Sequence, residues 1–162
     1  MKKKKWIIYL FALLLTGAFS RCTKNNSRFR VTSILTADIN GNSSFSAKMI
    51  SGKLDTIGGE PVLALSGFLS SSDPTGFTLI MDFPLQTLQA DTFTVSGVDF
   101  NDINYNLKGA LFVADPGNGG SGSINLTRVS PIHAAGTFQG ILADVTDSTQ
   151  IMTVTGTFNI QF

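Results

Sequence analysis

The sequence contains very little cysteine, histidine and charge. One cysteine and one histidine occur in 162 residues, and charged residues make up 14% of the chain. A single cysteine excludes an internal disulfide, and a single histidine excludes the His-rich zinc sites and any catalytic site that needs two imidazoles. The histidine, His133, follows Ser130-Pro131-Ile132 and reads as a residue that leads from a turn into a strand.

Long apolar runs are also missing. The longest, Trp6–Ala18, has 13 mostly apolar residues, which is short of the about 20 that a helix needs to span a bilayer. Four lysines, Lys2–Lys5, precede it. A positive cluster followed by a short apolar core is typical of an export signal, so we expect residues 1–21 to be a signal peptide.

Two cleavage sites compete at the end of this leader. Ala18-Phe19-Ser20 fits the small-x-small pattern of an ordinary signal peptidase, which would leave Cys22 as a free thiol. A cut before Cys22 would make it the lipid-modified N-terminus of a bacterial lipoprotein, carrying acyl groups such as palmitate, although Phe19 and Arg21 depart from the usual lipobox. A lone thiol is a liability in an oxidising compartment, which favours acylation at Cys22.

The charge of the chain divides at the cysteine. The whole sequence has 12 basic and 11 acidic residues, but five of the basic ones precede Cys22 and three more lie in residues 22–30, so residues 31–162 carry four basic against 11 acidic residues, a net charge of −7. Residues 22–33 are expected to form a polar, basic tether to an acidic domain. An acidic domain lacks the positive surface that nucleic-acid binding needs.

From Ile34 onward the chain alternates apolar and polar residues with period two. The clearest example is IMTVTGTFNIQF at residues 151–162, where Met152, Val154 and Phe158 alternate with threonines. This pattern predicts half-buried strands. The expected strand regions are 34–39, 45–54, 62–69, 76–83, 92–97, 105–113, 123–129, 133–143 and 151–162.

Turn residues separate these runs. Asn40-Gly41, Gly58-Gly59, Asp73-Pro74-Thr75-Gly76 and the stretch 115–120 provide positive φ or a preset turn. About nine short strands without helical periodicity indicate an all-β fold, a single antiparallel β-sandwich or barrel-like domain over residues 34–162.

Several motifs of this domain resemble a family of small lipoproteins common in Bacteroidetes-type bacteria. The resemblance lies in the leader, in TADING at residues 36–41 followed by Phe45-Ser46-Ala47, and in the closing segments GSGSINLTRV, AAGTFQGILADV and MTVTGTFNIQF. It implies an all-β domain behind a lipid anchor in the outer membrane, on the periplasmic or cell-surface side. The family is one of unknown function, so the resemblance transfers no catalytic residue. We expect no cofactor.

One segment could bind calcium. Asp99, Asn101, Asp102 and Asn104 place four oxygen-bearing side chains within six residues, and hard cations prefer oxygen ligands. The spacing is not that of an EF-hand, and an ordinary polar turn explains the same residues. The turn interpretation is the one we adopt.

Two further patterns have an equally ordinary explanation. Asp55-Thr56-Ile57 and Asp147-Ser148-Thr149 match an O-glycosylation pattern of exported proteins in these bacteria and fall in expected loops, which makes Thr56 and Ser148 weak acceptor candidates. The threonines of the last strands could form a flat ligand- or ice-contacting surface, but threonine also suits the wet face of any sheet.

Acidic pairs could serve glycosidase chemistry, but nearly all carboxylates fall at strand ends or in turns, where aspartate is favoured for local hydrogen bonds. The sequence therefore predicts a non-catalytic cell-envelope lipoprotein that binds a protein or a glycan through its loops. The alternative is a barrel-type carrier whose lumen holds a small apolar molecule.

Overall fold

The computed structural model describes residues 32–57, 59–83, 87–97 and 99–162. The expected signal peptide, Cys22 and nearly all of the tether lie outside these residues. The described residues belong to one compact unit, Val31–Phe162.

Eleven strands and one short 3-10 turn make up the described part of the chain. Their bounds are β1 (Ile34–Ile39), β2 (Ser43–Ser46), β3 (Met49–Ile57), β4 (Glu60–Phe68), β5 (Gly76–Asp82), β6 (Asp91–Val95), β7 (Asp102–Leu107), β8 (Ala110–Val113), η3 (Pro116–Asn118), β9 (Ser121–Ser130), β10 (His133–Asp144) and β11 (Ile151–Gln161). All pairings are antiparallel. The predicted all-β antiparallel class is confirmed. No helix in the described part of the chain is long and apolar enough to cross a bilayer.

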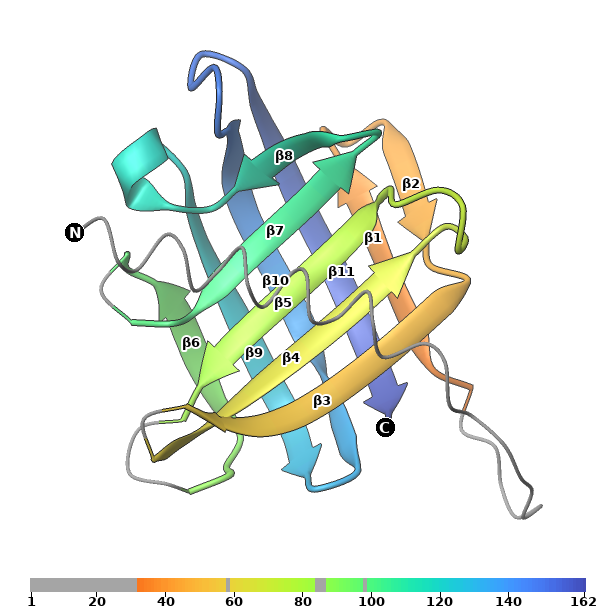
Figure 1. Ribbon diagram of the computed structural model, residues 1–162, viewed down its shortest axis with the longest axis vertical. Coiled ribbons are helices and arrows are strands. Elements are labelled where there is room, and N and C mark those ends of the chain that lie inside the picture. The colour runs from red at the N-terminus through yellow and green to blue at the C-terminus, as the bar shows by residue number, and fades with distance from the viewer. Residues whose placement is uncertain (1–31, 58, 84–86, 98) are drawn as a thin grey trace. The chain divides into compact units, whose positions relative to one another are not determined.

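The strands form one curled sheet that folds into two layers. Strands β3, β4, β5, β7 and β8 make the layer in front in Figure 1, and β2, β1, β11, β10, β9 and β6 make the layer behind. Strand β10 joins the layers, because most of it pairs with β9 while Ala143 and Asp144 pair with Val113 and Phe112 of β8. The fold is therefore a curled, half-barrel sheet that also has the two layers of a sandwich.

The core lies between the layers and follows the period-two alternation. Phe77, Leu79, Met81 and Phe83 all face inward from β5 and its end, as the sequence predicts, and each is at most 1% exposed. Phe77 is the centre of an aromatic cluster, with its ring centroid 4.4 Å from Tyr105, 5.2 Å from Phe45 and 5.3 Å from Phe138. Such ring pairs contribute about 0.5–1.5 kcal/mol each beyond the burial of their area.

Two of the expected strand regions are wrong in detail. Residues 105–113 form a hairpin instead of one strand, because Lys108 and Gly109 take φ of 51° and 99° and reverse the chain between β7 and β8. Tyr105 consequently shares its face with its register partner Phe112 on β8, and both are buried in the core, whereas Leu107 beside the turn is exposed. The alternation continues across the turn residues, so the period alone did not reveal the reversal.

Residues 45–54 likewise belong to two strands, at opposite ends of the strand order. Strand β2 ends at Ser46 and β3 begins at Met49. The two linking residues cross between the layers, and their backbone amides form hydrogen bonds to both of them. The Ala47 amide donates to Leu35 O of β1 at 2.9 Å, and the Lys48 amide donates to Phe68 O of β4 at 2.9 Å. Because two residues join the two ends of the strand order, the sheet has to curl back on itself.

Candidate functional site

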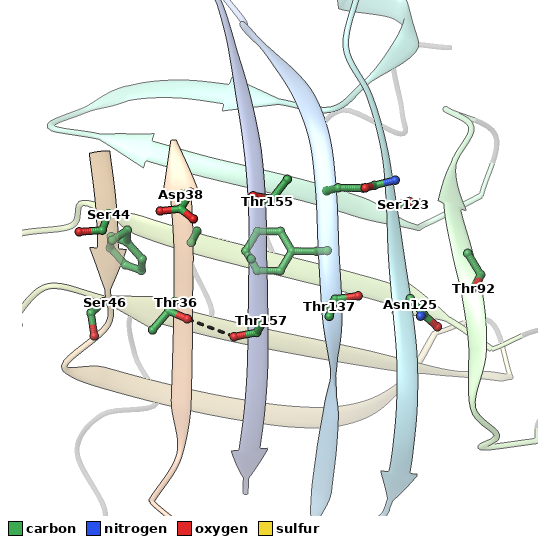
Figure 2. Close-up of a pocket in the computed structure, with 15 residues that line it drawn as sticks. Thr36, Asp38, Ser44, Ser46, Thr92, Ser123, Asn125, Thr137, Thr155 and Thr157 are labelled. Carbon is green, nitrogen blue, oxygen red and sulfur yellow. Dashed lines mark hydrogen bonds between the residues drawn. The ribbon is translucent and has the colours of Figure 1, made fainter. Parts of the chain in front are cut away.

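Polar side chains cover the outer face of the six-stranded layer in two rows. The register places one row, across β2, β1, β11, β10, β9 and β6, as Ser46, Thr36, Thr157, Thr137, Asn125 and Thr92. The second row runs beside it as Ser44, Asp38, Thr155, Gln139, Ser123 and Thr94. We call these twelve residues the hydroxyl face. Figure 2 shows ten of the twelve as labelled sticks in these two rows.

The hydroxyl face exists because each strand alternates. In β11, Val154 and Phe158 are buried in the core while Thr155 and Thr157 are exposed between them. Ten of the twelve side chains are exposed, and Thr36 and Ser123 are half-buried. Neighbouring strands lie about 4.8 Å apart, so side chains in one row are within reach of each other. One such contact joins Thr36 Oγ1 to Thr157 Oγ1 at 3.1 Å.

An open hollow of about 700 Å³ lies over this face. Eleven of the twelve hydroxyl-face residues line it, all except Thr94. A twisted sheet is saddle-shaped, so its face is concave along one diagonal. Below the polar side chains the hollow is bounded by Phe45, Phe138 and Gly156. Both phenyl groups belong to the core and are 5% and 2% exposed, so they offer no aromatic platform to a ligand.

The hydroxyl face is almost uncharged. Asp38 is its only ionisable side chain, and the other eleven residues are serine, threonine, asparagine and glutamine. Hydroxyl groups and carboxamides each both donate and accept hydrogen bonds. The hollow can therefore hydrogen-bond a neutral, hydroxyl-bearing partner, and its lining provides neither an acid–base pair nor a positive charge for phosphate.

The structure does not bring the four calcium candidates together. Asp102 and Asn104 lie on the outer face of the other layer, where Asn104 Nδ2 donates to Asp102 Oδ2 at 3.0 Å. Asn101 Oδ1 instead accepts from the Asp82 amide at 2.9 Å, and Asp99 Oδ2 accepts from Ser96 Oγ at 3.0 Å. Among the described residues, no three His, Cys, Asp or Glu side chains are placed to hold a metal ion together.

Among the carboxyl groups of the described residues, that of Asp102 has the most strongly shifted pKa. Burial raises its pKa to about 6, against the hydrogen bonds from Asn104 and the Ile103 amide, which lower it. Burial also raises the pKa of Asp82, with further increases from the negative charges of Glu60 and Asp99. Oδ1 of Asp82, of Asp102 and of Asn104 is buried without a hydrogen-bond partner. Protonated carboxyl groups suit such surroundings better than charged ones.

The remaining candidates lie apart from the hollow. Thr56 is exposed but belongs to β3 rather than to the expected loop, where its amide donates to Asp55 Oδ1 at 2.9 Å. Ser148 is exposed in the turn between β10 and β11, as expected. His133 begins β10 after a turn, and its Nε2 donates to Asn159 Oδ1 at 2.6 Å.

The sequence alone did not reveal the hydroxyl face as a site. The threonines of the last strands fit an ordinary wet face, and the partner was expected to bind through loops. A signal was present in the repeated polar positions of β1, β9, β10 and β11, but the alignment of those positions into rows depends on the register between strands.

Comparisons with known proteins add no further identification. The chain matches no protein-family model, and no curated protein and no solved structure is significantly similar to it. The function is therefore inferred from this chain's own residues.

Proposed function

We propose that the protein is a non-catalytic binding module of the bacterial cell envelope, held at the membrane by lipid on Cys22, which presents the hydroxyl face to its partner. The observation that carries the binding function is the open hollow of about 700 Å³ lined by eleven hydroxyl-face residues. The leader pattern and the lone cysteine support the anchor.

A binding role suits the hollow better than catalysis does. General acid–base chemistry needs titratable groups positioned against the reacting bond, and glycoside hydrolysis needs two carboxyl groups across a cleft. The hydroxyl face has the single carboxylate of Asp38. The chain's histidine, His133, is not among the residues that line the hollow.

A carrier of a small apolar molecule is the alternative that the sequence suggests. Such a carrier needs an apolar lumen, and ligand pockets of that kind are mostly apolar and enclosing. The space between the two layers contains 24 buried hydrophobic side chains packed as one cluster, whereas the hollow is open to solvent and eleven of the residues that line it have polar side chains. If the folded protein nevertheless bound a fluorescent hydrophobic probe stoichiometrically, the carrier would be the better interpretation.

The binding function can be tested in living cells with a photo-crosslinking amino acid. It is placed at Thr137, which lies in the hydroxyl face, and at Lys108, an exposed control in the β7–β8 turn. We expect a discrete crosslinked species from position 137 and none from position 108. Absence of crosslinking at both positions, or equal crosslinking at both, would contradict a partner on the hydroxyl face.

A further inference from the structure

We infer that the hydroxyl face binds an uncharged polysaccharide whose chain runs across the strands, along the row from Ser46 to Thr92. The inference rests on the proposed binding function and names the chemical class of the partner.

The chemistry of the lining matches sugar hydroxyls. A sugar hydroxyl donates one hydrogen bond and accepts others, and the side chains of serine, threonine, asparagine and glutamine do both. Eleven of the twelve residues of the hydroxyl face have such a side chain. Asp38 adds an acceptor for a sugar hydroxyl, and its charge disfavours an acidic polymer.

The same residues fit a protein partner poorly. Protein interfaces have an apolar centre enriched in aromatic residues, methionine and arginine, and a few large side chains such as tryptophan, tyrosine and arginine contribute most of the binding energy. None of these residue types occurs in the hydroxyl face. The phenyl groups of Phe45 and Phe138 that bound the hollow are buried and engaged with Phe77.

The geometry favours a polymer over a small ligand. Each row crosses six strands, and the five spacings of about 4.8 Å between them give a row about 24 Å long. The outermost strands of the rows, β2 and β6, each pair with one other strand, so both ends of the rows are at sheet edges. A chain longer than the hollow can therefore extend past both ends. The hollow is also concave, whereas an ice-contacting surface would have to be flat.

Binding to one chain is expected to be weak. The hydroxyl face has no aromatic ring on which a sugar could stack, so the affinity depends on hydrogen bonds. Each of these replaces a hydrogen bond to water and therefore contributes little net free energy of binding. Many copies anchored in one membrane would still hold a long polymer. Once one copy has bound the polymer, the neighbouring copies encounter it at a high effective concentration.

The test uses the acylated protein purified in detergent, run through native gels that contain a soluble polysaccharide. The probes are a neutral glucan, a neutral mannan and the acidic polymer alginate. We expect at least one neutral polymer to retard the protein and alginate to leave its mobility unchanged. Retardation by alginate alone would overturn the inference.

A double substitution locates the binding. Thr137→Val with Thr155→Val removes one hydroxyl from each row and keeps the β-branched shape that suits a strand. We expect it to weaken retardation at least tenfold. The matched control is Thr153→Val, because Thr153 is exposed on the same face of β11 but does not line the hollow, and it should change retardation less than twofold. Equal effects of the two variants would place binding elsewhere.

The outcomes separate this inference from the proposed function. If position 137 crosslinks to a protease-sensitive partner and no neutral polymer retards the protein, the hydroxyl face binds a protein and the polysaccharide inference fails alone. If neither crosslinking nor retardation occurs, both fail.

Discussion

The contact between Phe138 and Gly156 gives the sharpest test of how the hydroxyl face is supported. The two residues are register partners on β10 and β11, and the ring of Phe138 lies on the glycine, where a side chain would otherwise be. A Cβ added at Gly156 would overlap Phe138 Cζ and Cε1 and would lie 2.6 Å from the backbone oxygen of Thr36. The glycine is therefore required by the aromatic ring and by the close approach of β1.

The expected cost of Gly156→Ala follows from these contacts. Overpacking of a well-packed core costs about 1–3 kcal/mol, and the reduced entropy of the unfolded chain returns about 0.4–1 kcal/mol. We therefore expect a net loss of roughly 1–2 kcal/mol in the free energy of unfolding. Phe138 is 2% exposed, and Phe138→Ala should cost about 3–5 kcal/mol.

A double-mutant cycle isolates the contact. Phe138→Leu is the better partner variant, because it removes the ring and keeps an apolar side chain. In the Phe138→Leu background, Gly156→Ala should cost at least about 1 kcal/mol less than in the wild type, since contacting residues couple by about 0.5–3 kcal/mol. Urea unfolding followed by far-ultraviolet circular dichroism measures all four proteins.

The matched control is Gly117→Ala in the exposed turn η3, where the nearest atom to an added Cβ is Asp115 Oδ1 at 3.2 Å. It should change stability by less than about 0.5 kcal/mol, as surface substitutions usually do. If Gly156→Ala costs the same with and without the Phe138 ring, the reasoning about the ring is refuted and the β1 backbone alone excludes the side chain.

Four further outcomes are expected. Cys22→Ser should abolish incorporation of a clickable fatty acid and release the protein from the membrane fraction; a native protein that takes up no label would show that cleavage follows Ser20. Asp144 Oδ1 accepts from the Thr146 amide and hydroxyl, both at 2.7 Å, and these bonds lower its pKa, so Asp144→Ala should lower the melting temperature by several degrees at neutral pH. This difference should shrink as the pH falls below about 4, because the carboxylate is then protonated first in the unfolded state and, at still lower pH, in the folded state as well. The pKa of Asp102 is raised to about 6, so the stability that its carboxyl group contributes is full below about pH 4 and is lost as the pH rises through 6. Asp102→Asn should therefore melt at a higher temperature than the wild type at pH 8 and at the same temperature at pH 4. A difference in melting temperature that stays constant with pH would contradict the raised pKa. A chelator should leave the melting temperature unchanged, whereas a decrease of several degrees that Asp102→Ala abolishes would establish a calcium site.

Much of the fold could be predicted from local pattern. Alternation of apolar and polar residues identified β5, β6, β9 and β11, and shorter or fuller apolar runs indicated β1, β4 and β10. The inward set Phe77, Leu79 and Met81 is the one that the pattern predicts. The pattern failed where a turn preserved the alternation, at Lys108-Gly109, and where a link of two residues, Ala47-Lys48, left one strand and entered another. In both places the polarity continued while the direction of the chain changed.

The candidate site divides in the same way between sequence and tertiary structure. The sequence by itself determined that Thr36, Thr137 and Thr157 would be polar positions on half-buried strands, because the side-chain period of a strand is a local property. Only the tertiary structure decided that they are neighbours in one row. Thr36 and Thr157 are 121 residues apart in the chain and their hydroxyls lie 3.1 Å apart. Strand pairing depends on non-local backbone hydrogen bonds and on the closure of the curled sheet, and a shift of register by one residue would turn these hydroxyls into the core.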